Sequence, residues 1–159
     1  MNKYTICFIK QDSKVLLLNR ENPRWMGRWN GIGGKIEQGE TPDTCVLREV
    51  YEETGIKLTN VIYKGTINTI IDNEKADEIY AFISEISKEI KFKTPIKSSE
   101  GILDWKELSW ILHPQNTGVA EDIAYFFPTM LLKDEVYEHQ CIFNKNSLIG
   151  FSQRIISNN

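Results

Sequence analysis

Short runs in which apolar residues dominate recur along the chain between polar turns, and this pattern predicts β-strands. Two such runs open the sequence, at residues 4–9 and 14–20, with a polar turn at residues 11–13 between them. The later runs that predict strands span residues 60–71, 78–86, 103–108, 136–143 and 147–156. The polar stretch DNEKAD separates the first two of these later runs and predicts a turn.

A helical pattern covers residues 42–54 and has a clear signal at each end. Thr41 is a suitable N-cap, Pro42 fits the first helical position, and Gly55 is a natural C-terminal stop. The side of this helix that we expect to face the core consists of Val46, Leu47 and Val50.

A second helical pattern runs over residues 119–132, where Pro128 should kink or interrupt it. Strands and helices together predict a mixed α/β fold in which a sheet has helices packed against it. The length of 159 residues suits one domain, residues 1–159, with a sizeable core.

The amino-acid composition and net charge limit the classes of protein to which this chain can belong. With 41% hydrophobic and 26% charged residues the chain should fold, and a net charge of −3 gives no footprint for DNA or RNA binding. Three cysteines without a CxxC pair favour a reducing cytoplasm, and the N-terminal region has neither signal-peptide layout nor membrane length. Only two histidines are present, which weakens any Ser-His or Cys-His mechanism.

The most unusual segment is the loop NRENPRWMGRWNGIGGKIEQGE, residues 19–40, which contains five glycines. Long irregular loops in compact domains are usually functional, and glycines let a backbone approach a ligand closely. This loop leads directly into the first predicted helix, so both should form one site.

That helix contains REVYEE, residues 48–53, in which Glu49, Glu52 and Glu53 stand at i, i+3 and i+4 on one face, roughly opposite the apolar side. Like charges at these spacings cost about 0.2–0.5 kcal/mol per pair, and Arg48 offsets only part of that. Converging carboxylates suit a hard cation such as Mg²⁺ or Mn²⁺. A solvated acidic helix face is the alternative interpretation.

From Gly34 to Ile56 the chain reads GKIEQGETPDTCVLREVYEETGI, which resembles the Nudix box at every defined position. The resemblance implies a Nudix fold, a mixed sheet between helices (α/β/α), and hydrolysis of a nucleoside diphosphate linked to another group. It also implies that the ligands of the catalytic metals are the Gly34 carbonyl, Glu49, Glu52, Glu53 and Glu100. Metals suit this chemistry because they neutralise phosphate charge and make a water nucleophilic.

Further roles follow from the same resemblance. Arg48 would orient the carboxylates by a salt bridge, and Glu40 would hold the junction between loop and helix. Lys35 would lie near the phosphates as part of the catalytic set. Glu100 comes from outside the box, in KSSEGILDW, and an ordinary surface glutamate is its alternative interpretation.

The segment WMGRWNGIGGKIEQGE is similar to MutT-type Nudix enzymes, and the likeness to the animal oxidised-purine triphosphatases extends over nearly the whole chain. It implies that the substrate is bound by Asn30, Asp122, Lys35 and Arg20. An amide and a carboxyl group can together pair with a purine's polar edge. The alternatives are a turn residue for Asn30, a helix N-terminal carboxylate for Asp122, and solvated cations for Lys35 and Arg20.

Two features of the sequence leave the identity of the recognised nucleobase undecided. The animal enzymes carry a tryptophan where this chain has Ala120 and two adjacent aspartates where it has Asp122-Ile123, although a shifted alignment uses Glu121-Asp122 instead. Trp25 and Trp29 could stack a base, but large aromatic residues are more often part of the core.

The expected function is therefore Mg²⁺- or Mn²⁺-dependent hydrolysis of oxidised purine nucleoside triphosphates, such as 8-oxo-dGTP, to monophosphate and pyrophosphate. Alternative substrates are ordinary nucleoside triphosphates, ADP-ribose, dinucleoside polyphosphates or the 5′ end of RNA. A non-catalytic nucleotide sensor is the competing class. The expected partner is a small nucleotide, without stable nucleic-acid or membrane binding, for a cytoplasmic monomer or homodimer.

Overall fold

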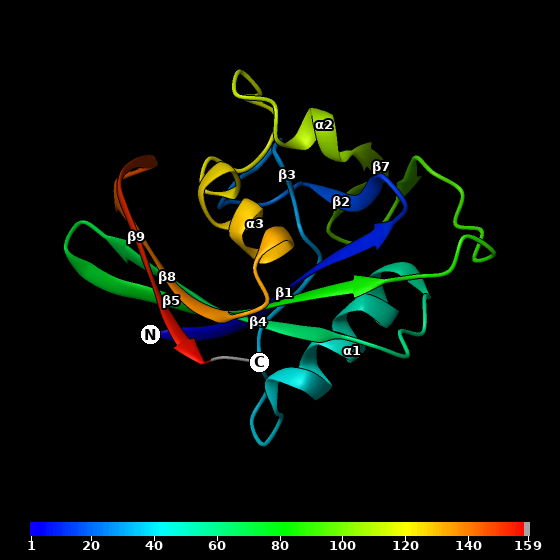
Figure 1. Cartoon of the computed structure of the whole chain (residues 1–159), viewed down its shortest axis with the longest axis horizontal. Helices are drawn as coiled ribbons and strands as arrows, with labels where there is room; N and C mark the ends of the chain where they lie inside the picture. The colour runs from blue at the N-terminus through cyan, green and yellow to red at the C-terminus, as the bar shows by residue number, and fades with distance from the viewer. Residues whose placement is uncertain (158–159) are drawn as a thin grey trace.

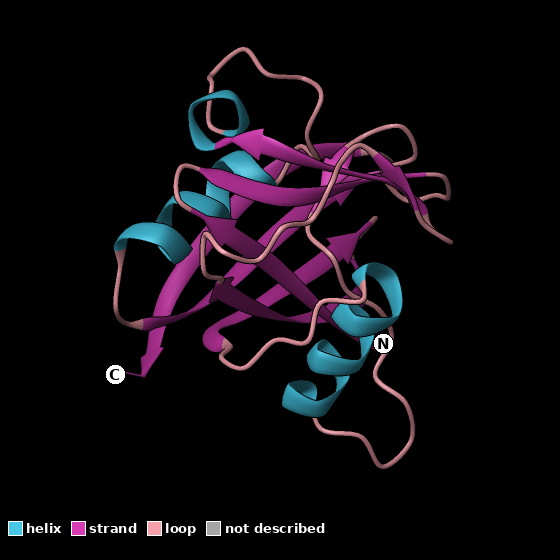
Figure 2. Ribbon diagram, turned by 90° about the vertical axis from the view of Figure 1, so that its right-hand side faces the viewer, coloured by secondary structure: helices cyan, strands magenta, loops and turns pink. Residues whose placement is uncertain are grey.

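In a computed structural model, which describes residues 1–157, the chain folds as a mixed sheet of nine strands with helices on both faces. Helix α1 (Pro42–Thr54) lies below the central strands and helix α3 (Ile123–Leu132) above them in Figure 1. Figure 2 shows the same helices on opposite sides of the strands. The expected α/β/α arrangement is confirmed.

The strands are β1 (Asn2–Gln11), β2 (Lys14–Arg20), β3 (Trp29–Asn30), β4 (Ile62–Ile71), β5 (Glu74–Glu85), β6 (Ile96–Lys97), β7 (Gly101–Glu107), β8 (Val136–Asn144) and β9 (Ser147–Ser157). They follow the order β6-β7-β2-β1-β5-β4-β8-β9, and β3 pairs with β2. The pairs β1–β5 and β4–β8 are parallel, and the other pairs are antiparallel. A short helix, α2 (Leu108–Ile111), follows β7.

The central strand β1 shows how the sequence builds two cores at once. Its successive side chains point to opposite faces, as a period of two requires. Ile6 and Phe8 join the apolar cluster beneath α3, while Cys7 and Ile9 join the cluster beneath α1. A near-continuous apolar run is therefore the expected pattern for a strand covered on both faces.

Helix α1 has the predicted bounds and caps: the Thr44 N–H donates to the Thr41 hydroxyl at 3.3 Å, and Gly55 adopts φ 73°. The prediction for its apolar side was wrong in one place, because Leu47 is 38% exposed. Cys45 is buried in its stead, beside Val46 and Val50. Compared with the prediction, the buried side of α1 is therefore rotated away from Leu47 and toward Cys45. It also takes in Glu49, which is buried rather than opposite the core.

The second predicted helix begins later than expected, because α3 starts at Ile123 rather than at residue 119. The cause is a tertiary contact that a helical pattern cannot show. The Ala120 N–H donates to the Trp29 carbonyl at 2.9 Å, and Val119 forms a parallel bridge with Trp29. Pro128 lies inside α3 and does not end it. Because Val119 and Ala120 pair with Trp29, the helix begins only after Asp122, which is its N-cap residue.

Strand bounds differ from the predictions mainly at turns. The turn between β4 and β5 is shorter than DNEKAD, because Asp72 and Asn73 adopt positive φ and β5 already begins at Glu74. Strand β1 is longer than predicted, and β4 starts two residues later. The short elements β3, β6 and α2 were not predicted, since two to four residues carry no periodic signal.

The glycine-rich loop lies along β1 and so reaches α1 in a defined position. The Thr5 N–H donates to the Gly34 carbonyl at 2.9 Å, and the Cys7 N–H donates to the Ile32 carbonyl at 2.7 Å. Between these bonds, a Cβ on Gly33 would lie 1.9 Å from the Thr5 carbonyl oxygen. Only glycine allows this close approach of two backbones.

We therefore expect Gly33→Ala to destabilise the protein by about 3 kcal/mol or more, because the added methyl group meets rigid backbone. Gly39→Ala is the matched control: its Cβ meets nothing within 4 Å, so only its positive φ costs energy, about 1 kcal/mol. Urea denaturation of both variants measures the difference. Equal losses of stability would show that the close approach to β1 is not needed.

Candidate active site

A cavity of about 380 Å³ opens between the loop, the sheet and α3. Its lining includes these predicted site residues: Arg20, Asn30, Gly34, Lys35, Glu100 and Asp122. It also includes residues that sequence analysis did not assign to a site: Tyr4, Arg24, Phe126 and Phe143. The cavity thus runs from an acidic end near α1 to an apolar end beneath α3.

At the acidic end, the Arg48 guanidinium contacts three carboxylates. Nε and Nη2 donate to the two oxygens of Glu40 at 2.7 and 2.9 Å. Nη1 donates to Glu49 Oε1 at 2.7 Å and to Glu52 Oε2 at 3.3 Å. The fork to Glu40 is bidentate, which is the strongest geometry for such a pair. Arg48 therefore sets the positions of carboxylates from both loop and helix.

Glu40 joins the loop to this network from its own side. The hydrogen bond from Arg48 holds the pKa of Glu40 at about 2, well below its usual range. Glu40 Oε2 also accepts the Glu37 N–H at 3.0 Å, which closes the turn before the helix. The contacts agree with the expected place of Glu40 at the loop–helix junction.

Glu53 connects helix α1 to the loop before β7, which also carries Glu100. Glu53 Oε1 accepts a hydrogen bond from the Ser99 hydroxyl at 2.7 Å, while Glu53 Oε2 is buried without a partner among the described residues. Burial, followed by the charge of Glu53, raises the pKa of Glu100. Burial also raises the pKa of Glu49, with its acidic neighbours adding to the effect. The structure thus concentrates more negative charge here than Arg48 neutralises.

Gly34 packs directly against this acidic face. A Cβ at Gly34 would lie 2.3 Å from the carboxyl carbon of Glu49, so the glycine makes room for that carboxylate. The Gly34 carbonyl accepts the Thr5 N–H, and a carbonyl oxygen retains a second lone pair.

The donor set fits a hard divalent cation, because it is made of oxygens and includes a buried carboxylate oxygen that lacks a partner. Among residues 1–157, no group of three or more His, Cys, Asp or Glu side chains is arranged to hold a metal ion by itself. An open face of carboxylates is what Mg²⁺ sites usually provide, since this ion keeps several waters and shares substrate phosphates.

The other end of the cavity carries Asp122 and Asn30. Asp122 is buried, its Oδ1 has no partner among the described residues, and burial raises its pKa to about 6. Its side chain makes no capping hydrogen bond to α3, although the backbone N–H groups of Asp122 and Ile123 lower its pKa against the larger effect of burial. Asn30 Oδ1 accepts the Gly31 N–H at 2.8 Å, so the side chain supports its turn and can still donate through NH₂.

The predicted cations and tryptophans lie in different surroundings. Lys35 is exposed at the cavity, and Arg20 lines it while its Nε donates to the Arg24 carbonyl at 2.9 Å. Trp25 lines the cavity and meets Phe143 edge-on. Trp29 packs instead under the Lys106 ammonium at 4.3 Å.

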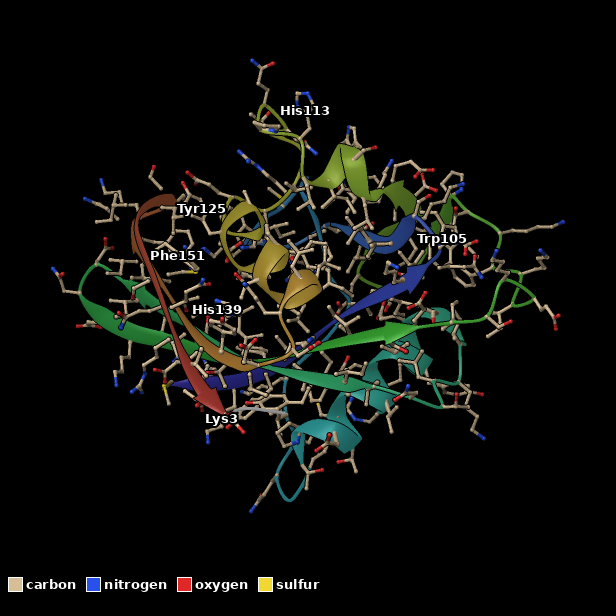
Figure 3. The ribbon with its side chains drawn as sticks, in the orientation of Figure 1. Lys3, Trp105, His113, Tyr125, His139 and Phe151 are labelled. Carbon is tan, nitrogen blue, oxygen red and sulfur yellow. The ribbon has the colours of Figure 1, made fainter. Side chains whose placement is uncertain are left out.

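The two histidines lie apart from this cavity. Figure 3 shows His113 on the loop after α2 and His139 on β8 near Phe151. The ring of His139 stacks with Tyr137 and Phe151, each at 5.9 Å between ring centroids. Neither histidine belongs to the cavity lining, and burial lowers the pKa of His139 to about 4.

None of the helices in residues 1–157 is long and apolar enough to cross a bilayer.

Comparison with known proteins gives one family. The model of the NUDIX domain matches residues 2–130. The mouse oxidized purine nucleoside triphosphate hydrolase is 28% identical over 152 residues, 95% of this chain and 93% of that protein. The NAD-capped RNA hydrolase NudC of Vibrio atlanticus is 44% identical over 62 residues, 38% of this chain and 22% of that protein. The crystal structure of a MutT protein from Bacillus halodurans covers 96% of this chain and 97% of its own, with a TM-score of 0.77 and 27% identity.

The raised pKa of Asp122 gives a test of its burial. The folded protein keeps a proton that the unfolded chain loses above its ordinary pKa of 3.8, so this group makes stability fall as pH rises from about 4 to 6. Asp122→Asn removes that titration. We expect its free energy of unfolding, relative to wild type, to improve by about 2 kcal/mol between pH 4.5 and 7.5. Urea denaturation across that range measures this, and parallel pH curves would contradict it.

Proposed function

Because the chain belongs to the NUDIX domain family of hydrolases, we propose that it hydrolyses oxidised purine nucleoside triphosphates, such as 8-oxo-dGTP. The products would be the nucleoside monophosphate and pyrophosphate, which cleans the nucleotide pool. The observation that carries the proposal is one cavity that is lined at one end by Gly34, which packs against Glu49 of α1, and by Glu100, and at the other end by Asn30 and Asp122. The likeness to the mouse enzyme over nearly its whole length supports the same substrate class.

Nudix hydrolases generally use divalent metal ions, and here Glu49, Glu52, Glu53, Glu100 and the Gly34 carbonyl would hold them. Mg²⁺ or Mn²⁺ would neutralise phosphate charge and lower the pKa of a bound water. The unpartnered Oε2 of Glu53 and the raised pKa values of Glu49 and Glu100 support this set.

The protein's own groups would place the reactants. Arg48 holds Glu49 and Glu52 in fixed positions, so the carboxylates need not reorganise during the reaction. Lys35 and Arg20, at the same cavity, would contact the phosphates. As the alternative to contacting a metal, Glu100 would accept a proton from the attacking water while the water oxygen bonds to phosphorus and the anhydride bond between the α- and β-phosphates breaks, which releases pyrophosphate.

At the far end, Asn30 and Asp122 would read the base between aromatic walls. The amide can donate and the carboxylate can accept, and a site built on such bonds rejects bases that leave them unpaired. The apolar wall includes Phe126 and Phe143. We propose further that residues 1–159 act as one domain in the cytoplasm.

One alternative substrate class has a specific observation in its favour. The 62-residue match to NudC shows that a similar segment serves a NAD-capped RNA hydrolase. A nucleoside diphosphate derivative other than a triphosphate would use the same acidic face. The net charge of −3 gives RNA little electrostatic attraction.

We expect Glu53→Gln to reduce hydrolysis of 8-oxo-dGTP by about 10²-fold or more, because it removes one carboxylate from the proposed metal face. Glu37→Gln, at an exposed loop position outside the cavity lining, should stay near wild-type activity. The assay measures pyrophosphate release with Mg²⁺ or Mn²⁺, and thermal melting confirms that each variant is folded.

The substrate panel should include dGTP, ADP-ribose and a dinucleoside polyphosphate. Equal efficiency on 8-oxo-dGTP and dGTP would remove the preference for oxidised bases. A wild type that hydrolyses nothing on the panel would favour a nucleotide sensor. Full activity of Glu53→Gln would show that the proposed metal ligands are wrong.

A further inference from the structure

Arg24, in the loop between β2 and β3, lines the apolar end of the cavity. Its guanidinium carbon lies 3.9 Å from the centroid of the Phe143 ring and 5.3 Å from that of Trp25. Its Nη2 is buried and has no hydrogen-bond partner among the described residues. A buried N–H donor without a partner is costly, about 1–3 kcal/mol and more for a charged group.

Asp122 lines the same cavity and has an unpaired acceptor where Arg24 has an unpaired donor. Its buried Oδ1 lacks a hydrogen donor among the described residues. The two charges are close enough to interact: Arg24 lowers the pKa of Asp122 against the larger effect of burial. The buried Cys141 thiol also responds to both charges. Nevertheless Arg24 Nη2 and Asp122 Oδ1 are not bonded to each other, since both atoms remain without a partner among the described residues.

We propose that Arg24 and Asp122 form one donor–acceptor pair that reads the edge of the base, with Arg24 donating to a purine carbonyl oxygen and Asp122 accepting from the neighbouring ring N–H. The proposal rests on the proposed function and adds Arg24 as a specificity-determining residue. A guanidinium can only donate and a carboxylate can only accept, so together they demand an acceptor beside a donor. A carbonyl next to a ring N–H meets this demand.

Oxidised guanine presents such an edge twice. The 6-carbonyl stands beside the N1–H, and oxidation creates a second edge in which the 8-carbonyl stands beside an N7–H. Ordinary guanine offers only the first edge, because its N7 is an acceptor and its C8 carries no polar group. Phe143 restrains the guanidinium by stacking on its plane, so the donor direction is set before the base arrives.

The test is Arg24→Met, which keeps the length of the side chain and removes its donors. Arg28→Met is the matched control, because Arg28 belongs to the same loop, does not line the cavity, and donates to the Val119 carbonyl at 3.4 Å. Both variants and wild type are assayed for KM and kcat on 8-oxo-dGTP, dGTP and 6-thio-dGTP. The last substrate replaces the 6-carbonyl oxygen with sulfur, a weaker acceptor.

We expect Arg24→Met to raise KM for 8-oxo-dGTP by about 10- to 100-fold, the effect of one hydrogen bond to a charged group. The value of kcat should change by less than about threefold, because Arg24 lies away from the acidic end. If the rise in KM largely disappears on dGTP, Arg24 reads the 8-carbonyl. If it persists on dGTP and disappears on 6-thio-dGTP, Arg24 reads the 6-carbonyl.

Equal rises in KM on all three substrates would overturn the proposal, since they would show a general effect on the shape of the cavity. A rise below about threefold on 8-oxo-dGTP would overturn it as well. Arg28→Met should leave all three KM values near wild type, and thermal melting of both variants tests their folding.

A binding measurement separates this inference from the proposed hydrolysis. Isothermal titration of wild type and Arg24→Met with 8-oxo-dGMP, without added metal, reports on base recognition alone. Weaker binding by the variant supports the role of Arg24 even if the wild type hydrolyses none of the triphosphates. Equal binding together with full hydrolysis by the wild type would overturn only this inference.

Discussion

The site depends on the hydrogen bonds that the Arg48 guanidinium makes with carboxylates from two segments of the chain. It holds Glu40 at the end of the loop and Glu49 on the helix, each at 2.7 Å in the shorter contact. Without this cation the loop would have no charged anchor on α1, and the helix face would repel itself. Since the loop also pairs with β1, Arg48 links the sheet, the glycine-rich segment and the helix into one frame.

In and beside the cavity, several polar atoms are buried away from water without a hydrogen-bond partner. Glu53 Oε2 at one end, and Asp122 Oδ1 with Arg24 Nη2 at the other, are buried without partners in the described part of the chain. Each lowers the stability of the folded protein, because burial removes water that no protein group replaces. The two cores above and below the sheet supply the stability that this requires. Such groups fit a binding site, where a ligand completes the missing bonds.

Local signals predicted the parts of the fold that depend on neighbours in sequence. Thr41, Pro42 and Gly55 specify both ends of α1, and REVYEE specifies its acidic face through helical spacing alone. The same signals failed where distant segments compete. Residues 119–122 look helical, yet Val119 and Ala120 pair with Trp29 of β3, and Asp122 lines the cavity directly before α3. The prediction that Leu47 faces the core was wrong, because the apolar pattern of the helix allows either Leu47 or Cys45 to lie beside Val46 and Val50.

The acidic face of α1 follows from sequence alone, because the Nudix-box residues lie within 23 consecutive positions, residues 34–56, and the helix brings its carboxylates to one side through its own geometry. At the other end of the cavity the resemblance suggested Asn30 and Asp122, but the neighbours of these residues depend on the tertiary structure. Arg24, Asp122 and Phe143 come from three distant segments, and no spacing relates them. Their meeting depends on which strands pair and on how α3 packs, both of which are long-range interactions. For that reason the sequence gives no sign of Arg24, whose role is inferred from its buried, unpartnered Nη2 in the folded structure.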